Sequence, residues 1–209
     1  ILQQTGAART RSRAYKVAVV VNDMAALNVD GSLVRGSRVL GDAKMIELHN
    51  GCICCTLRED LLTSIAELAF EKKFDAIVIE STGVSEPAEV AQTFVAPISH
   101  PSLRGAEALM EVARLDTCVT VVDCSAFNGI LTTASTIMEL FAGNKAEEGD
   151  TRSVAPLLMA QVEFADVVVL NKTDLVGEPQ AGAIEAAIRV LNPGAKILRT
   201  TRSNAPLES

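Results

Sequence analysis

Short apolar runs that alternate with helical patterns constrain the fold of this chain most strongly. Six runs have the length and composition of buried strands: Lys16–Val21, Met45–His49, Ala76–Ile79, Cys118–Val122, Val167–Leu170 and Lys196–Leu198. Helical patterns lie between them at Glu59–Lys72, Pro87–Val95, Ala126–Phe141, Val154–Phe164 and Ala181–Leu191. This alternation predicts an α/β fold with a doubly wound, mostly parallel sheet. Ligands of such sheets bind beyond the carboxyl ends of the strands.

Composition and charge restrict the classes of function. With 209 residues and 48% hydrophobic residues, the chain can bury one large core. Its net charge of −7 argues against nucleic acid as a partner, because nucleic-acid binders normally have a basic surface. No stretch reaches the roughly eighteen consecutive apolar residues of a membrane span, so no membrane is expected. Adjacent free thiols suit a reducing compartment. We therefore expect a cytoplasmic protein, or an organellar matrix protein if a targeting peptide lies upstream.

A cysteine cluster follows the second apolar run. Three of the five cysteines, Cys52, Cys54 and Cys55, lie within four residues. Adjacent thiolates bind a soft divalent ion, and a disulfide between such close neighbours would be strained, so the cluster predicts a site for Zn²⁺ or Co²⁺. His49 is a candidate fourth ligand, although the alternation of the strand can point it elsewhere. The alternatives are a buried thiol cluster and a redox site that exchanges electrons with a partner protein.

Asn171-Lys172-Thr173-Asp174 follows the apolar run Val167–Leu170. Asn-Lys-x-Asp in this position is the guanine-reading motif of GTP-binding proteins. The Asp174 carboxylate can accept two hydrogen bonds, from the guanine ring N–H and its exocyclic amino group. Adenine offers neither donor in that arrangement, and an acid left unpaired is costly, so the motif predicts guanine specificity. We expect Asn171 to brace the loop and the stem of Lys172 to lie flat on the base. The alternative is an ordinary polar strand end.

Two further acids follow apolar runs. Glu80 ends the run that begins at Ala76, and Gly83 comes three residues later. In phosphate-binding α/β proteins an acid in this position holds Mg²⁺, usually through water, and the glycine lets its N–H approach the γ-phosphate. Asp23 follows the first run and could orient the attacking water, bind the metal ion, or belong to an ordinary loop.

Three other residues have less specific surroundings. Asp123 follows the run Cys118–Val122 and lies near the nucleotide or caps the helix that begins beyond Ser125. Cys118 and Cys124 are isolated from the other thiols, and we expect both to be packed in the interior.

Together these motifs resemble the CobW-type GTPases, metallochaperone relatives of the urease- and hydrogenase-maturation GTPases. The resemblance rests on three stretches and extends over nearly the whole chain: Gly51–Leu61, Glu80-Ser81-Thr82-Gly83 through Pro87, and Asn171-Lys172-Thr173-Asp174. It implies a P-loop GTPase that uses GTP and Mg²⁺ and delivers zinc or cobalt to a client metalloprotein, with a nucleotide-dependent homodimer as a further partner. It assigns catalysis to Asp23 and Glu80, nucleotide binding to Gly83, Asn171, Lys172 and Asp174, and metal binding to Cys52, Cys54, Cys55 and Asp23.

The chain departs from the family pattern in two ways. Relatives carry a phosphate loop of the form G-x-x-x-x-G-K-[ST], but none of the 13 glycines here precedes lysine. We therefore expect the first strand and the phosphate loop upstream of Ile1. Residues 1–209 would then be a single GTPase domain without that segment or the family's C-terminal domain, inactive by itself. Ala26 also replaces a glutamate of many relatives, a possible metal ligand. The alternative is a non-hydrolysing metal-binding or interaction module that has lost the phosphate loop.

Overall fold

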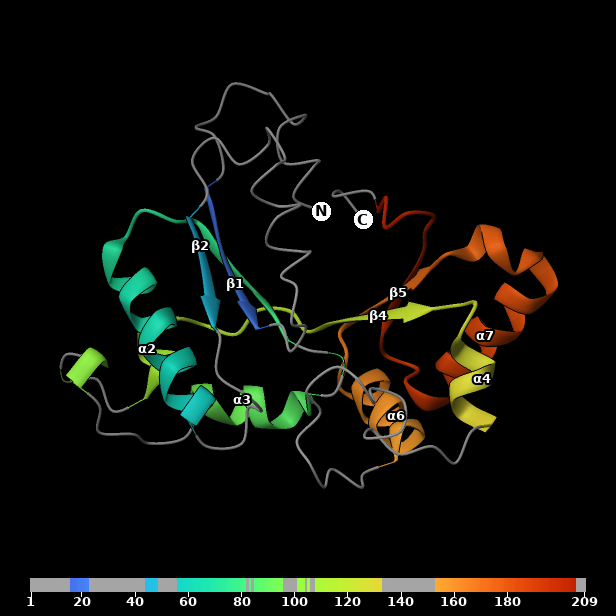
Figure 1. Cartoon of the computed structure of the whole chain (residues 1–209), viewed down its shortest axis with the longest axis horizontal. Helices are drawn as coiled ribbons and strands as arrows, with labels where there is room; N and C mark the ends of the chain where they lie inside the picture. Colours follow the sequence, from blue (N-terminus) through green and yellow to red (C-terminus); the bar gives the residue numbers. More distant parts are fainter. Residues whose placement is uncertain are drawn as a thin grey trace. The chain divides into compact units, whose positions relative to one another are not determined.

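The computed structural model describes residues 16–22, 44–48, 56–81, 83, 85–95, 101–103, 105, 108–132 and 153–205. These residues form two compact units (Figure 1). The first unit contains the described residues up to Leu115, and the second contains those from Asp116 onward.

The first unit contains a parallel sheet of three strands in the order β2-β1-β3. Its strands are β1 (Val17–Asn22), β2 (Lys44–Leu48) and β3 (Ala76–Glu80). Because β1 pairs with a neighbour on each side, Val19 lies between Met45 and Val78 in the register. The five residues from Val17 to Val21 are all buried.

The helices of the first unit are α2 (Thr56–Glu71) and α3 (Pro87–Val95), with the 3₁₀ turns η1 (Pro101–Leu103) and η2 (Leu109–Glu111). The buried side chains of α2 recur at helical spacing and pack in one core with Ala18 and Val20 of β1: Leu61, Leu62, Ile65, Ala66 and Leu68. Full burial of one such leucine contributes about 1.5–3 kcal/mol. This core fixes α2 against the middle strand of the sheet.

The second unit contains a parallel sheet in the order β4-β5-β6. Its elements are β4 (Val119–Asp123), α4 (Phe127–Thr132), α6 (Val154–Phe164), β5 (Val167–Asn171), the 3₁₀ turn η3 (Thr173–Leu175), α7 (Gly177–Leu191) and β6 (Lys196–Arg199). Val168 and Leu170 of the middle strand pack with Ile184 and Ile188 of α7 and Val162 of α6.

The predicted elements match the observed ones closely. Every predicted strand lies within one residue of an observed strand, and the bounds of α3 and α6 are as predicted. α2 begins at Thr56, three residues before the predicted start, and α7 begins at Gly177, four residues before its predicted start. The glycine there has φ of 72°, which suits a residue without Cβ. Of the predicted helix Ala126–Phe141, α4 covers the part up to Thr132, and the rest lies outside the described residues.

The α/β class with parallel strands is confirmed. Val78 of β3 and Val119 and Val121 of β4 are 40%, 46% and 61% exposed. Alternate side chains of a strand point to opposite faces, so Val122 packs on helices of its unit while Val121 does not. Among the described strands, β3 and β4 each lie at one end of the strand order of their sheet. In the same residues, no helix has the length and hydrophobicity that a bilayer span requires.

An aspartate fixes the start of one strand pair in each sheet. Asp75 Oδ2 accepts from the Lys16 N–H at 2.8 Å, and the Asp75 N–H donates to the Lys16 carbonyl at 2.8 Å. Asp166 pairs with Cys118 in the same two ways, at 2.7 and 2.9 Å. Because each aspartate holds two paired strands in register, the carboxyl ends of these two strands lie side by side.

Candidate functional site

Asn171 ends β5 and binds the segment that follows β6. Its Oδ1 accepts from the Ser203 N–H at 2.8 Å and from Thr200 Oγ1 at 3.2 Å, and its Nδ2 donates to Ser203 Oγ at 2.9 Å. A side chain held on both its oxygen and its nitrogen has little rotamer freedom. Asn171 therefore joins two segments that are 29 to 32 residues apart in the sequence.

The segment from Thr200 to Ser203 belongs to this site but was not predicted from the sequence. Thr173 donates its hydroxyl to the Thr200 carbonyl at 3.1 Å, and Arg202 and Ser203 have φ values of 52° and 55°. Left-handed backbone at residues other than glycine costs free energy and persists only where surrounding contacts hold it. The sequence does contain a pattern that could have indicated this segment. The apolar run Lys196–Leu198 is followed by polar residues, as is the run Val167–Leu170, and the carboxyl ends of parallel strands lie at the same edge of a sheet.

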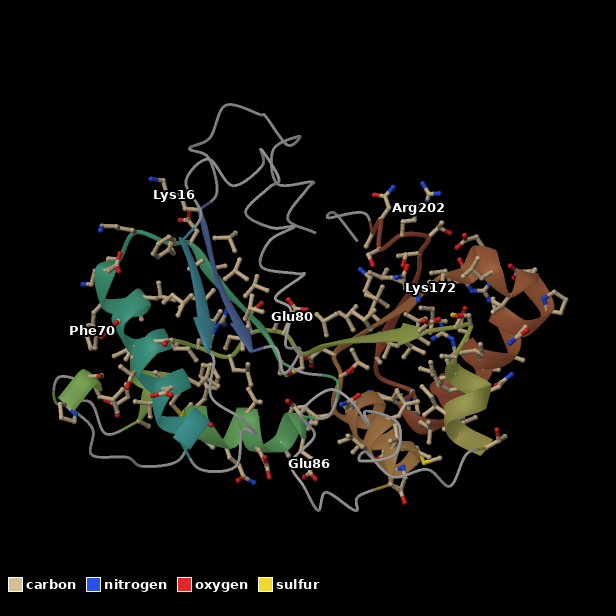
Figure 2. The ribbon with its side chains drawn as sticks, in the orientation of Figure 1. Lys16, Phe70, Glu80, Glu86, Lys172 and Arg202 are labelled. Carbon is tan, nitrogen blue, oxygen red and sulfur yellow. The ribbon has the colours of Figure 1, made fainter. Side chains whose placement is uncertain are left out.

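Lys172 (Figure 2) also has left-handed backbone, with φ of 60°. Its Nζ lies 2.6 Å from Asp123 Oδ2. Asp123 Oδ1 accepts from the Ser125 N–H at 2.9 Å and from its hydroxyl at 2.6 Å. Asp123 therefore forms a turn with Ser125 before α4 and also pairs with Lys172. The ion pair was not predicted from the sequence. Burial raises the pKa of the Asp123 carboxyl, but hydrogen bonds from Lys172 and Ser125 outweigh it, so that the pKa lies below its ordinary value.

Asp174 lies in η3 with its side chain exposed to solvent. The turn is closed by the Leu175 N–H, which donates to the Lys172 carbonyl at 3.0 Å. A fixed turn with an exposed carboxylate, next to a lysine with a long aliphatic stem, can bind a flat heterocycle that presents two N–H donors on one edge. Recognition of guanine by this motif stays a prediction.

Of the residues assigned to the phosphates, Glu80 and Gly83 lie in the described part of the first unit. Glu80 is the last residue of β3, is exposed, and pairs in register with Val21 of β1 (Figure 2). Gly83 lies in an exposed turn three residues later. Asp23, the other residue assigned to catalysis, lies outside the described residues. The catalytic and phosphate-binding roles therefore stay predictions.

The predicted metal ligands Cys52, Cys54, Cys55 and Asp23 lie outside the described residues, as does His49. The cysteines fall between β2 and α2 in chain order. Across the ranges that the structure does describe, no group of three or more His, Cys, Asp or Glu residues could hold a metal ion. The metal site therefore stays a prediction.

The two isolated cysteines lie in the second unit. Cys124 is fully buried in its core, as predicted, whereas Cys118 is only partly buried. Burial raises the pKa of both thiols, and a neighbouring carboxylate raises it further, Asp166 for Cys118 and Asp123 for Cys124. Because the thiolate is the form that binds metal, the raised pKa disfavours metal binding at both cysteines.

The sequence profile described as the CobW/HypB/UreG nucleotide-binding domain matches residues 2–199. The chain belongs to this family. It is 42% identical over 202 residues to zinc-regulated GTPase metalloprotein activator 1 of Dictyostelium discoideum, covering 92% of this chain and 41% of that protein. It is 28% identical to the zinc chaperone CobW of Pseudomonas aeruginosa, covering 92% of this chain and 51% of that protein.

A solved structure of the family shows the same fold. The zinc-bound YjiA GTPase from E. coli matches with a TM-score of 0.54 at 23% identity, covering 95% of this chain and 53% of that one. The chain thus spans about half the length, or less, of the relatives compared with it.

Proposed function

We propose that the protein containing this CobW-family domain is a GTP-dependent metallochaperone. It binds Zn²⁺ or Co²⁺ through Cys52, Cys54 and Cys55, with Asp23 as a further ligand, and delivers the ion to a client metalloprotein. The observation that carries this proposal is the end of β5, where a braced asparagine precedes an exposed aspartate. Relatives described as a zinc-regulated GTPase and as a zinc chaperone support it.

Guanine specificity follows from the rigidity of this strand end. Asn171 is fixed by three hydrogen bonds to Thr200 and Ser203, so the turn that carries Asp174 has a defined position before any ligand arrives. The carboxylate then meets the two N–H donors of guanine without a further cost of ordering the loop. Adenine would bury the same carboxylate without partners, which costs several kilocalories per mole.

At the phosphates, Glu80 would hold Mg²⁺ through water, Gly83 would offer its N–H to the γ-phosphate, and Asp23 would orient the attacking water. An exposed carboxylate at the end of a parallel strand fits this role of Glu80. Bound Mg²⁺ would neutralise charge on the phosphate oxygens.

Nucleotide and metal binding are coupled in this proposal. GTP would order the chain after Asp23 and Glu80, and hydrolysis would release it, which changes how the three cysteines are presented to the ion. In this account the protein works in a reducing compartment, where the thiols stay free, and pairs with a second copy when GTP is bound. The other candidate, a metal-binding module without hydrolysis, predicts no GTP turnover by the full-length protein.

Nucleotide choice tests the first half of the proposal. Competition of GDP and ADP against a fluorescent guanine nucleotide, on the full-length protein, should give a Kd for GDP at least about 100-fold below that for ADP, because the unpaired acid alone costs about 3 kcal/mol. Equal affinities for the two nucleotides would contradict the guanine site.

Cobalt titration tests the metal half. One equivalent of Co²⁺ should give an intense thiolate-to-metal absorption that Zn²⁺ removes, and binding should weaken as the pH falls because the thiols must lose protons. Replacement of Cys52, Cys54 and Cys55 by serine should abolish the absorption, whereas Cys118→Ser, the matched control, should leave it unchanged. A triple variant with the wild-type spectrum would place the metal elsewhere.

A further inference from the structure

We propose that Asp123 is a positioning residue of the guanine site, which holds Lys172 in the orientation where the lysine stem receives the base. The inference deepens the proposed function and rests on it. Asp123 itself touches neither the base nor the phosphates in this account, and acts only through Lys172.

The sheet places the two residues together. Asp123 ends β4 and is the register partner of Asn171, which ends β5, so the residue after Asn171 emerges beside the Asp123 carboxylate. The Cys124 N–H donates to the Asn171 carbonyl at 3.0 Å and continues the pairing past the end of β4. The backbones that carry Asp123 and Lys172 are therefore held next to each other by the pairing of β4 and β5.

Both oxygens of Asp123 are engaged. One accepts the two hydrogen bonds from Ser125, and the other lies 2.6 Å from Lys172 Nζ. The carboxylate therefore has a fixed rotamer before the lysine reaches it. The side chains of Lys172 and Asp123 are 48% and 34% exposed, so the pair remains open to solvent and to a ligand.

An exposed ion pair ordinarily contributes little, because holding a long lysine side chain in one geometry costs as much conformational entropy as the attraction returns. A lysine that packs on a bound base must lose that freedom in any case. If Asp123 already restricts the Lys172 side chain before the nucleotide arrives, nucleotide binding does not cost this conformational entropy. The smaller entropy cost corresponds to a factor of about two to ten in Kd. The benefit of the pair then appears in nucleotide affinity more than in stability.

A double-mutant cycle in the full-length protein tests this inference. Asp123→Asn keeps an oxygen that can accept from Ser125 but places an amide, which cannot accept from Lys172, at the other position. Lys172→Met keeps an apolar stem and removes the charge. The Kd for GDP should rise about two- to tenfold in Asp123→Asn and should not rise further when Asp123→Asn is added to Lys172→Met. Asp123→Ala should repeat this pattern in an independent cycle.

Two controls separate positioning from general damage. Glu178→Gln removes one carboxylate from the exposed Arg199 pair of the same unit and should leave the Kd for GDP unchanged. The ratio of the Kd values for inosine and guanosine diphosphate, which reports the Asp174 contact with the exocyclic amino group, should stay at its wild-type value in Asp123→Asn.

The outcomes distinguish this inference from the proposed function. Wild-type protein that binds no GDP would overturn both. Wild-type binding with an unchanged Kd in Asp123→Asn would overturn the inference alone. An Asp123→Asn effect of equal size in the Lys172→Met background would also overturn it, because Asp123 would then act without the lysine.

Discussion

Asn171 and Asp174 differ in their surroundings although they belong to one short motif. Asn171 is engaged by Thr200 and Ser203, and Asp174 is exposed three residues later. The motif predicts a structural role for Asn171 and a binding role for Asp174, and the binding role stays a prediction. The partners of Asn171 could not be predicted, because they come from a segment some thirty residues away whose left-handed backbone has no glycine to mark it.

Substitution of Asp174 by asparagine should change the base that the full-length protein prefers. The amide presents a donor where the carboxylate presented an acceptor, so it matches the 2-carbonyl of xanthine and opposes the amino group of guanine. Competition binding should show a weaker affinity for GDP, by about 100-fold, and a measurable affinity for xanthosine diphosphate. A variant that keeps wild-type affinity for GDP would show that Asp174 does not contact the base.

At the scale of elements, the apolar runs predicted the strands well because burial in a parallel sheet leaves a continuous apolar sequence. Helix starts were predicted less well, as at α7, where Gly177, Glu178 and Pro179 form a helix start that the apolar periodicity does not include. Some contacts between elements depend on one polar side chain, and the apolar pattern of the sequence does not show them. Asn192 follows α7 and donates to the Val162 and Ala165 carbonyls at the end of α6, at 2.9 and 2.8 Å.

Asn192→Ala should lower the free energy of unfolding by about 1–3 kcal/mol, because the carbonyls at the end of α6 lose the donor that the Asn192 side chain supplies. The Ala195 N–H also loses its side-chain acceptor, Asn192 Oδ1, which lies 3.1 Å from the Ala195 nitrogen. Urea unfolding at neutral pH measures the change. Asn128→Ala on the exposed side of α4 is the matched control and should change the free energy by less than about 0.5 kcal/mol. Equal effects of the two substitutions would show that the α6–α7 contact does not stabilise the unit.

Glu185 of α7 should contribute a pH-dependent part of the stability. Hydrogen bonds from Arg189 and Arg199 hold the pKa of its carboxyl below the ordinary value. Because the folded pKa is the lower one, the unfolded chain binds the proton first, and the contribution is present above about pH 4.5 and lost as the pH falls through the folded pKa. Glu185→Gln should therefore unfold more easily than wild type at pH 7, and the difference should shrink as the pH falls below about 4.5. A difference that does not change with pH would contradict this role.

For the whole molecule, family membership and the α/β class with parallel strands agree with the sequence analysis. The Asn-Lys-x-Asp motif could be found in the sequence because it consists of four consecutive residues after one strand. The ion pair between Asp123 and Lys172 could not be predicted, because it depends on the register between β4 and β5, which a sequence does not show. The cysteine cluster was recognised by composition alone, since thiol ligands are rare enough to be informative wherever they gather.

In the proposed function, the nucleotide and the metal ion bind to one coupled system. The most direct measurement is the Kd for Zn²⁺ of the full-length protein, taken by competition with a chromophoric chelator, once with GDP and once with a non-hydrolysable GTP analogue. We predict that the two Kd values differ by at least about fivefold, which corresponds to a coupling free energy of about 1 kcal/mol. Zn²⁺ should then change the ratio of the Kd values for the two nucleotides by the same factor, relative to the metal-free protein. Identical Kd values for Zn²⁺ in the two nucleotide states would contradict it.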